Sequence, residues 1–167
     1  MIKNVFNLYY LMSLLLLAGL YTIPYAKALS DKDHETAMKN PNTNFAQGIA
    51  QNPRYKVDED DRIFLRNNPS TKFAEYLALN PNYIVRDEDK NFAQKNPDSG
   101  FAEGLAKNPT YLIRTVDKEF ARNNPNSRYS IGLVMNPHYI IETVDREFAR
   151  NNPTLRISEE LAKNPSY

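Results

Sequence analysis

Residues 97–124 read PDSGFAEGLAKNPTYLIRTVDKEFARNN, and this pattern recurs along most of the chain. Its marker is an Asn-Pro dipeptide that returns at two alternating intervals, a short one such as Pro97 to Pro109 and a long one such as Pro109 to Pro125. Together the two intervals make a 28-residue period. The prolines are Pro41, Pro53, Pro69, Pro81, Pro97, Pro109, Pro125, Pro137, Pro153 and Pro165. A fixed period in this range is typical of proteins built from stacked structural repeats.

Each period contains a short half, such as 97–108, and a long half, such as 109–124. In the short half two apolar residues lie four apart, as Phe101 and Leu105 do, which places both on one face of a helix. The long half carries an aliphatic residue and a phenylalanine seven apart, here Ile113 and Phe120, again at helical spacing. Strict alternation of apolar and polar residues is absent, so we predict an all-α fold without strands.

The Asn-Pro junctions indicate where helices begin. Asn is a preferred N-cap and Pro is preferred at the first helical position, so we predict a helix start at each junction. Where a second Asn precedes, as at Asn67, Asn123 and Asn151, we expect it to take the left-handed C-terminal position of the preceding helix. The long half has two possible structures: one helix, or an extended corner around its tyrosine followed by a shorter helix that begins near its aspartate.

Two short helices, each with one apolar stripe, cannot bury that stripe alone, so neighbouring pairs must stack. We therefore predict a short α-solenoid of 28-residue helix-turn-helix repeats. Its expected parts are a degenerate N-terminal capping half-repeat at 29–40, four full repeats at 41–68, 69–96, 97–124 and 125–152, and a terminal half-repeat at 153–167. The general plan resembles the short α-hairpin repeats of tetratricopeptide and Sel1-like proteins, whose period is longer and whose Trp signature is absent here.

Residues 1–28 have the order of a secretory signal peptide. Lys3 precedes an apolar stretch, Pro24 breaks it, and the small residues Ala26 and Ala28 predict cleavage after Ala28. The alternative is an uncleaved anchor, because the apolar stretch is long enough to supply the roughly 20 residues that a bilayer requires. Either interpretation predicts export, to the periplasm or out of the cell.

Composition narrows the function classes. The absence of cysteine excludes disulfides, a thiol nucleophile and a Cys-based zinc site. Beyond residue 28 the chain carries 19 Lys plus Arg against 20 Asp plus Glu, a near-neutral balance that gives no electrostatic footprint for nucleic acid. No second apolar span follows the first, so we expect no membrane span after signal cleavage.

The sequence offers no catalytic constellation. His34 and His138 are isolated and are interpreted as unrelated by the repeat, which argues against a histidine-based metal or catalytic site. The serines lack a Gly-x-Ser-x-Gly turn and a partner histidine series. We therefore predict a protein that is not an enzyme, with no catalytic, cofactor-binding or metal-binding residues.

A tyrosine recurs two positions after the proline of each long half. The series is Tyr55, Tyr83, Tyr111 and Tyr139, with Tyr167 as a remnant. Such rings could form a ladder that stacks on sugars or contacts an extended peptide, which makes them candidate partner contacts. The alternative is that each ring packs between neighbouring hairpins with its hydroxyl at the edge.

Glycine recurs in the short half at Gly48, Gly104 and Gly132. A helical glycine costs about 1 kcal/mol relative to alanine, so its recurrence predicts a close approach between helices. Tyr76 replaces this glycine in the second repeat, where we expect a local bulge or an outward-facing ring. Tyr76 is therefore a further candidate for partner contact.

Two other series are interpreted as structural. The aspartates Asp61, Asp89, Asp117 and Asp145 could bind cations, but the spaced ligands and glycine of an EF-hand loop are missing, so we expect them to cap a helical segment or bond a neighbouring repeat. The phenylalanines Phe64, Phe92, Phe120 and Phe148 are predicted to lie in the core.

These observations favour an exported, non-enzymatic interaction module that binds a protein or peptide partner. One alternative is a structural protein that self-associates head to tail, since a contact that does not close can propagate. Another is a glycan-binding surface on the tyrosine ladder. The charged residues expected on the surface are Arg54, Lys56, Lys72, Glu75, Arg86, Glu103, Arg114, Arg128 and Glu142.

Overall fold

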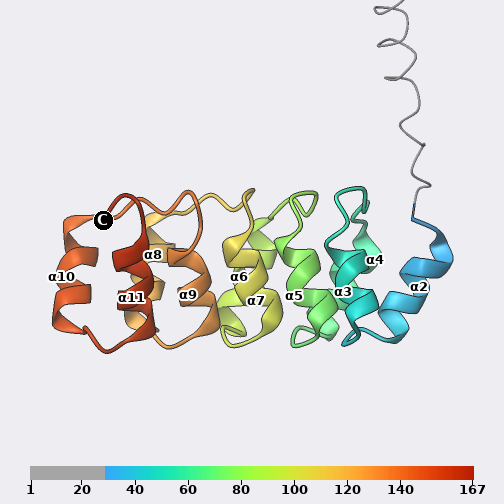
Figure 1. Ribbon diagram of the computed structural model, residues 1–167, viewed down its shortest axis with the longest axis horizontal. Coiled ribbons are helices and arrows are strands. Elements are labelled where there is room, and N and C mark those ends of the chain that lie inside the picture. Colours follow the sequence, from blue (N-terminus) through green and yellow to red (C-terminus); the bar gives the residue numbers. More distant parts are fainter. Residues whose placement is uncertain (1–28) are drawn as a thin grey trace, which may run out of the picture.

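The structure is a computed structural model, and it describes residues 29–167. Within this range every regular element is a helix, which confirms the all-α prediction. The helices are α2 (Asp31–Lys39), α3 (Asn44–Ala50), α4 (Glu59–Asn67), α5 (Lys72–Leu79), α6 (Asp87–Lys95), α7 (Gly100–Lys107), α8 (Thr115–Asn123), α9 (Arg128–Val134), α10 (Thr143–Asn151) and α11 (Arg156–Lys163). They stand side by side in one elongated row from α2 to α10 and α11 (Figure 1). The predicted signal peptide, residues 1–28, lies outside the described residues.

The helices of the short halves begin well after the Asn-Pro, so the predicted helix start at each junction is wrong. In α7 the N-cap is Ser99, whose hydroxyl accepts the N–H of Ala102. Asn96 instead ends the preceding helix, and its carbonyl accepts the N–H of Ser99 at 3.1 Å in a tight turn. Because proline pushes the residue before it out of the α region, the Asn cannot continue a helix, and the Asn-Pro forms the turn between two helices.

The expected left-handed Asn is also wrong. Among residues 29–167 no residue, glycine included, has a positive φ. Asn67 is the last residue of α4, and its neighbour Asn68 takes a φ of −130° as the C-cap. The side chain of Asn68 then donates to the carbonyl of Phe64 at 3.0 Å, which satisfies the helix end without a left-handed residue.

The long half adopts the second of its two possible structures, an extended corner followed by a shorter helix. We call the segments 51–58, 80–86, 108–114 and 135–142 the corners. Each is followed by a nine-residue helix, α4, α6, α8 or α10. Ile113 therefore lies in a corner and Phe120 in α8, so the two do not share a helical face as predicted. Both nevertheless pack against the core.

The core repeats an aromatic triad at the spacing of the sequence period. The Phe101 ring meets Tyr83 and Phe92 edge to face, with centroids 6.2 and 5.6 Å apart. Equivalent contacts join Tyr55, Phe73 and Phe64, and also Tyr111, Tyr129 and Phe120. Edge-to-face packing of this kind adds to the stabilisation from apolar burial. The phenylalanine series is half-buried and packs against the fully buried residues.

Glycine sets the distance between the most tightly packed helices, α5 with α7 and α7 with α9. A Cβ at Gly104 would lie 2.0 Å from the Glu75 carbonyl oxygen, and one at Gly132 would lie 2.8 Å from the Ala106 Cβ. Gly48 has no such neighbour within 4 Å, so the predicted close approach holds at two of the three glycines. Where Tyr76 and Glu160 take the place of glycine, the helices α5 and α11 pack less closely on their predecessors.

An asparagine at the end of four short halves, Asn80, Asn108, Asn136 or Asn164, contacts the preceding repeat. The Asn108 amide donates to the carbonyls of Ala78 and Asn80 at 2.7 and 2.9 Å, and its own oxygen accepts the N–H of Thr110 at 2.7 Å. Asn80 and Asn136 make the same contacts, whereas Asn164 lies 3.5 Å from the Val134 carbonyl. The last interface is thus looser, and it is the one that carries Glu160.

Candidate interaction surface

The recurring aspartates are internal hydrogen-bond acceptors. Asp61, Asp89, Asp117 and Asp145 are each 0% exposed. One carboxylate oxygen accepts the N–H of the N-cap residue, as Asp89 does from Arg86 at 3.1 Å. The other accepts the hydroxyl of the preceding tyrosine, at 2.6 Å for Tyr55 and 3.0 Å for Tyr83. Each aspartate therefore caps the start of a helix and fixes the corner before it. Within residues 29–167 no group of three or more His, Cys, Asp or Glu side chains is placed to bind a metal ion.

A cation from the preceding long half reaches each of three corners. Arg62 lies 2.6 Å from the Asp89 carboxylate and 4.2 Å from the centre of the Tyr83 ring. Lys90 stacks in the same way on Tyr111 at 4.1 Å. Burial lowers the pKa of Lys90, and the charge of Arg114 adds to this effect. These buried charges join residues that are distant in the sequence, so they link neighbouring repeats.

The two histidines occupy different positions of the repeat, so the repeat does not relate one to the other, as the sequence predicts. His34 stands one period before Arg62, and its Nε2 lies 2.8 Å from the Asp61 carboxylate. His138 contacts the Pro109 carbonyl at 2.9 Å, as the equivalent Asn82 contacts Pro53 at 2.7 Å. Each histidine thus takes a repeat position that another residue type fills elsewhere in the chain.

The tyrosines of the full repeats do not form an exposed ladder. Tyr55, Tyr83, Tyr111 and Tyr139 are at most 3% exposed, so their predicted role as surface contacts is corrected. The rings fill the space between neighbouring halves because their hydroxyls have the buried aspartates as partners. Tyr76 is half-buried and packs against the core, while Tyr167 remains 42% exposed. The four rings of the full repeats therefore offer no exposed ladder on which a glycan could stack.

Burial of these phenols predicts unfolding in alkali. Desolvation is the largest cause that raises the pKa of Tyr55, Tyr83, Tyr111, Tyr129 and Tyr139 above 10. In the unfolded chain a tyrosine ionises near pH 10, so the unfolded state loses protons that the folded state keeps. Each such tyrosine should lower the free energy of unfolding by up to about 1.4 kcal/mol per pH unit above pH 10.

Urea unfolding between about pH 9 and pH 11 measures this slope. Tyr129→Phe is the matched variant, because phenylalanine stands at the equivalent positions Phe73 and Phe101. This variant also removes the short contact between the hydroxyls of Tyr111 and Tyr129. Its stability should fall less steeply with pH than that of the original protein. If the free energy of unfolding falls equally steeply with pH in both proteins, ionisation of the buried phenols is not the cause of the lost stability.

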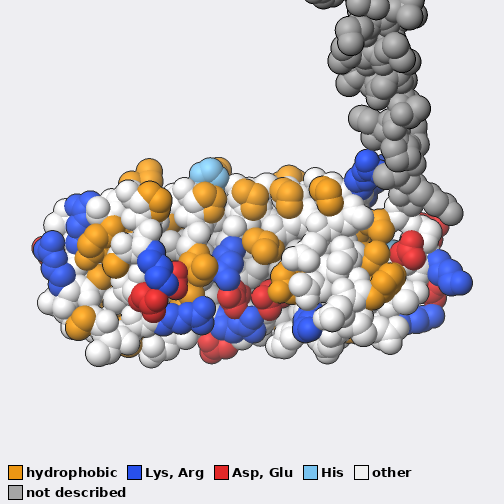
Figure 2. Space-filling view, in the orientation of Figure 1, with side chains coloured by type: hydrophobic (Ala, Val, Ile, Leu, Met, Phe, Trp, Pro, Cys, Tyr) orange, Lys and Arg blue, Asp and Glu red, His pale blue; other side chains and the backbone are white. Residues whose placement is uncertain are grey.

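A row of apolar side chains that was not predicted from the sequence is exposed on the surface. Ile84, Leu112 and Ile140 each follow a buried tyrosine and are 60%, 68% and 68% exposed. We call these three residues the corner row. Figure 2 shows hydrophobic side chains at intervals along the edge that the corners form. The signal was present in the sequence, since the residue after the recurring tyrosine is apolar in three consecutive repeats.

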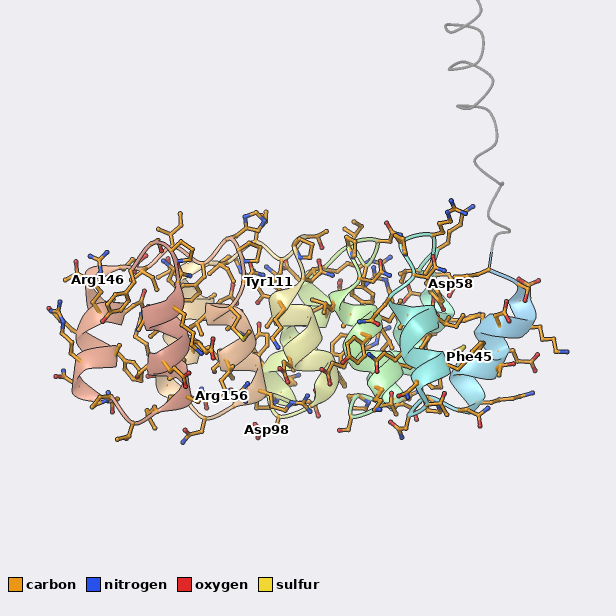
Figure 3. All side chains as sticks on the ribbon, in the orientation of Figure 1. Phe45, Asp58, Asp98, Tyr111, Arg146 and Arg156 are labelled. Atoms are coloured by element: carbon orange, nitrogen blue, oxygen red, sulfur yellow. The ribbon has the colours of Figure 1, made fainter. Side chains whose placement is uncertain are left out.

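The backbone of each corner is fixed from inside. Buried cations donate to the carbonyls of the corner row: Arg62 to Ile84 at 2.8 Å, Lys90 to Leu112 at 2.9 Å and Lys118 to Ile140 at 2.8 Å. Successive side chains of an extended segment point to opposite sides, so burial of each tyrosine directs the next side chain outward. Figure 3 shows Tyr111 near the ends of the helices, close to the edge that the corners form. The three side chains of the corner row are therefore held at a fixed spacing.

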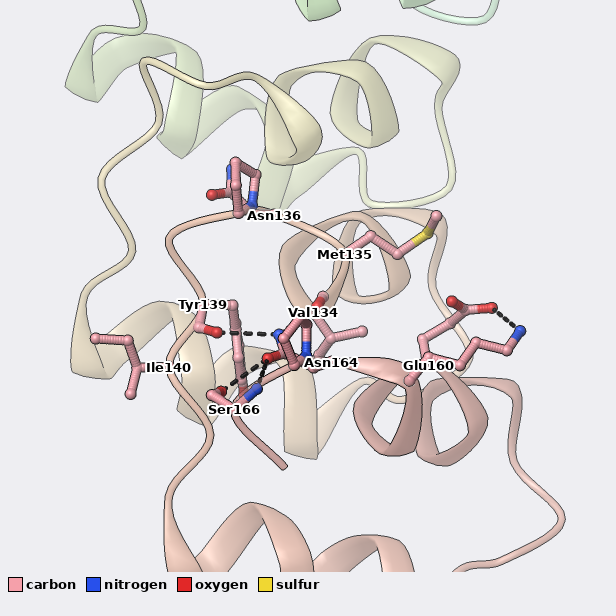
Figure 4. Close-up of a pocket in the computed structure, with 11 residues that line it drawn as sticks. Val134, Met135, Asn136, Tyr139, Ile140, Glu160, Asn164 and Ser166 are labelled. Carbon is pink, nitrogen blue, oxygen red and sulfur yellow. Dashed lines mark hydrogen bonds and ion pairs between the residues drawn. The ribbon is translucent and has the colours of Figure 1, made fainter.

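A groove adjoins the last member of the row. It lies between the corner 135–142 and the end of α11, has a volume of about 440 Å³, and is lined mainly by apolar groups that include Val134, Met135 and Ile140 (Figure 4). The Glu160–Lys163 ion pair, at 3.2 Å, lies on the opposite side. The groove lies where α11 packs less closely on α9 than α9 does on α7, and Glu160, which takes the place of the recurring glycine, lines it.

Several charged residues that were expected to face a partner are engaged within the fold. Arg128 pairs with Glu75 at 2.9 Å and with Glu103 at 2.6 Å. Burial acts to raise the pKa of Glu103, but hydrogen bonds from Lys107 and Arg128 outweigh it and lower the pKa. Arg114 pairs with Asp87 across neighbouring long halves. Among the exposed apolar side chains of residues 29–167, those of the corner row recur at one position in three consecutive repeats.

Comparisons of the chain with protein-family models, with curated proteins and with solved structures found no match. Within residues 29–167 no helix has both the length and the apolar character needed to cross a membrane.

Proposed function

We propose that the protein is an α-solenoid of 28-residue helical hairpins that acts as an exported, non-enzymatic interaction module. The recurrence of the aromatic triad, of the asparagine ties and of the buried aspartates at one spacing supports the solenoid. The signal-like order of residues 1–28 supports export. In this proposal residues 29–40 form the polar cap.

The partner is a protein or peptide that lies along the corner row. The observation that carries this proposal is the exposure of Ile84, Leu112 and Ile140 at one position of three consecutive corners. Exposed apolar groups at regular positions, with nearly neutral surroundings, suit a partner that offers apolar side chains rather than a polyanion. The fixed corner backbones reduce the entropy lost on binding. The groove beside Ile140 provides room for one larger apolar side chain.

The test places a photo-reactive phenylalanine derivative at position 112 and crosslinks in cells of the source organism. A matched control carries the same group at Asn91, an exposed position on α6. We expect one protein adduct from position 112 and none from position 91. The adduct should be lost when Ile84 and Ile140 are replaced by serine, because each buried side chain of this size contributes about 2 kcal/mol to binding.

Serine at these exposed positions should change the free energy of unfolding by less than about 0.5 kcal/mol each, so loss of the adduct would not reflect unfolding. An adduct that persists in the serine variant would contradict the proposal that the partner binds along the corner row. If instead the particle mass of the original protein grows with concentration and that of the serine variant does not, the corner row mediates self-association.

A further inference from the structure

Two helix interfaces in the row are wider than the others, because a larger residue replaces glycine at the position that faces the preceding helix. In α7 this position is Gly104, where a Cβ would lie 2.0 Å from a backbone oxygen of α5, so these two helices meet closely. Tyr76 stands one period earlier, in α5, and Glu160 stands two periods later, in α11. Both α5 on α3 and α11 on α9 pack less closely than α7 does on α5. Each wider interface therefore leaves space for a large side chain.

In α5 the chain fills this space with a ring of its own. The Tyr76 side chain is half-buried and packs against the core. Its place in the repeat puts it on the face of α5 that meets α3, as Gly104 lies on the face of α7 that meets α5. An aromatic ring is therefore the side chain that this protein itself uses between two helices of the short halves at the wider spacing.

In α11 the space forms a groove. Glu160 has no ring, and the groove of about 440 Å³ lies between the end of α9, α11 and the corner 135–142 (Figure 4). Met135 and Ile140, which line its apolar side, are 45% and 68% exposed. An apolar cavity of about 150 Å³ is enough to hold a benzene molecule. The groove thus has room for the ring that Glu160 does not supply.

The edge of the groove offers a hydrogen-bond acceptor. The Glu160 side chain is 15% exposed, and its carboxylate lies 3.2 Å from the Lys163 ammonium. That ammonium lies closer to Glu159, at 2.6 Å. A carboxylate has about four acceptor positions, so Glu160 can accept a further hydrogen bond from a group at this edge.

Tyrosine matches both features of the groove. Four buried tyrosines of this chain donate their hydroxyls to the recurring aspartates, at 2.6 Å from Tyr55 to Asp61 and at 2.8 Å from Tyr111 to Asp117. A tyrosine of a partner offers the same pairing, since it combines an apolar ring with a hydroxyl that donates to a carboxylate. Leucine or phenylalanine would fill the groove but leave the acceptor unused.

We propose that the groove between the corner 135–142 and α11 is a pocket for a tyrosine side chain of the partner, whose ring packs on Met135 and Ile140 and whose hydroxyl donates to Glu160. This inference rests on the proposed function, because Ile140 belongs both to the corner row and to the groove. It adds the identity of the residue that the partner presents at this end of the row. The partner then runs from Ile84 past Leu112 and places its tyrosine in the groove.

The probe is p-cresol, the side-chain analogue of tyrosine, and its control is toluene, which lacks the hydroxyl. Methionine methyl groups labelled with carbon-13 in the full chain report binding by NMR, since Met135 lines the groove and Met38 lies in α2, at the other end of the row (Figure 1). p-Cresol should shift the Met135 signal with half-saturation on the order of 1 mM, as expected of so small a ligand, and leave Met38 unchanged. Toluene should bind roughly tenfold more weakly, because it makes no hydrogen bond to the carboxylate.

Three variants locate the binding. Glu160→Tyr copies Tyr76 and fills the groove from within, so it should abolish the p-cresol shift of Met135. Glu160→Gln removes the charge of the acceptor and should weaken p-cresol binding several-fold, toward that of toluene. Glu159→Gln is the control, since Glu159 is 62% exposed and does not line the groove, and it should bind p-cresol as the original protein does. An unchanged Met38 signal and helix content by circular dichroism check that each variant folds.

Absence of a p-cresol shift at Met135, or a shift that survives in Glu160→Tyr, would overturn the proposal. A Met135 signal that moves with protein concentration alone would also overturn it, because a second copy of the chain then occupies the groove. The crosslink from position 112 tests the proposed function separately. If that adduct forms while p-cresol leaves Met135 unchanged, a partner binds the corner row but places no tyrosine in the groove.

Discussion

Replacing Gly104 with alanine should lower the free energy of unfolding by about 3 kcal/mol or more. The new Cβ would lie 2.0 Å from the Glu75 carbonyl oxygen and 2.9 Å from its carbonyl carbon. Both are backbone atoms of the neighbouring helix α5, so no side chain can move aside, and α7 has to shift away from α5. That shift also strains the three hydrogen bonds of the Asn108 amide to the preceding repeat. Urea unfolding followed by far-ultraviolet circular dichroism measures the loss.

Gly48→Ala is the matched control, since Gly48 occupies the same position of the repeat two periods earlier. No atom of a neighbouring element lies within 4 Å of a Cβ there. Alanine should therefore stabilise α3 by up to about 1 kcal/mol through its higher helix propensity. The two substitutions are chemically identical and should have opposite signs. If both destabilise the protein equally, glycine does not set the helix spacing by close approach.

Asp89→Ala should destabilise the protein by about 3 to 5 kcal/mol, because it leaves a buried guanidinium without its partner. The Asp89 carboxylate is 0% exposed and the Arg62 side chain is 5% exposed, with 2.6 Å between them. The same carboxylate accepts from the Tyr83 hydroxyl and from the Arg86 N–H, so its loss also frees the corner and the start of α6. The midpoint and slope of urea unfolding give the change in stability.

Asp87→Ala removes the same side chain two positions earlier, where it is 76% exposed and pairs with Arg114 at 3.1 Å. A surface pair of this kind contributes at most about 1 kcal/mol. A second test adds Arg62→Met to Asp89→Ala, which removes the stranded charge and should recover part of the lost stability. Equal effects of Asp87→Ala and Asp89→Ala would contradict the role given to the buried pair.

The all-helical fold and the packing roles of the apolar series could be predicted because they depend on local spacing. The pair Phe101 and Leu105 faces the core as its spacing of one helical turn requires. The helix starts were misplaced because Asn and Pro are favoured both at helix starts and in turns. The N-caps in the structure, such as Thr71 and Ser99, stand two positions after the proline. Ser and Thr are also preferred N-caps, but the recurring Asn-Pro was taken as the start instead.

The candidate surface could not be predicted to the same extent. Tyr111 and Leu112 are neighbours, and both are residues that can lie in a core or on a surface. Which of them is buried depends on the acceptor that Asp117 offers inside and on the Lys90 ammonium, which holds the Leu112 carbonyl from the preceding long half. The contact between His34 and Asp61 was not predicted for a related reason, since Asp61 belongs to the next long half of the chain.

The sequence by itself determined the 28-residue period, the helical character of both halves and the positions at which glycine or proline interrupts them. These properties follow from backbone preferences and from side-chain spacing within one or two turns. Only the tertiary structure decided that the tyrosines and aspartates lie inside, that Ile84, Leu112 and Ile140 lie outside, and that His34 faces Asp61. Burial and charge pairing are set by contacts between neighbouring repeats, and no local preference encodes which side of an extended corner meets them.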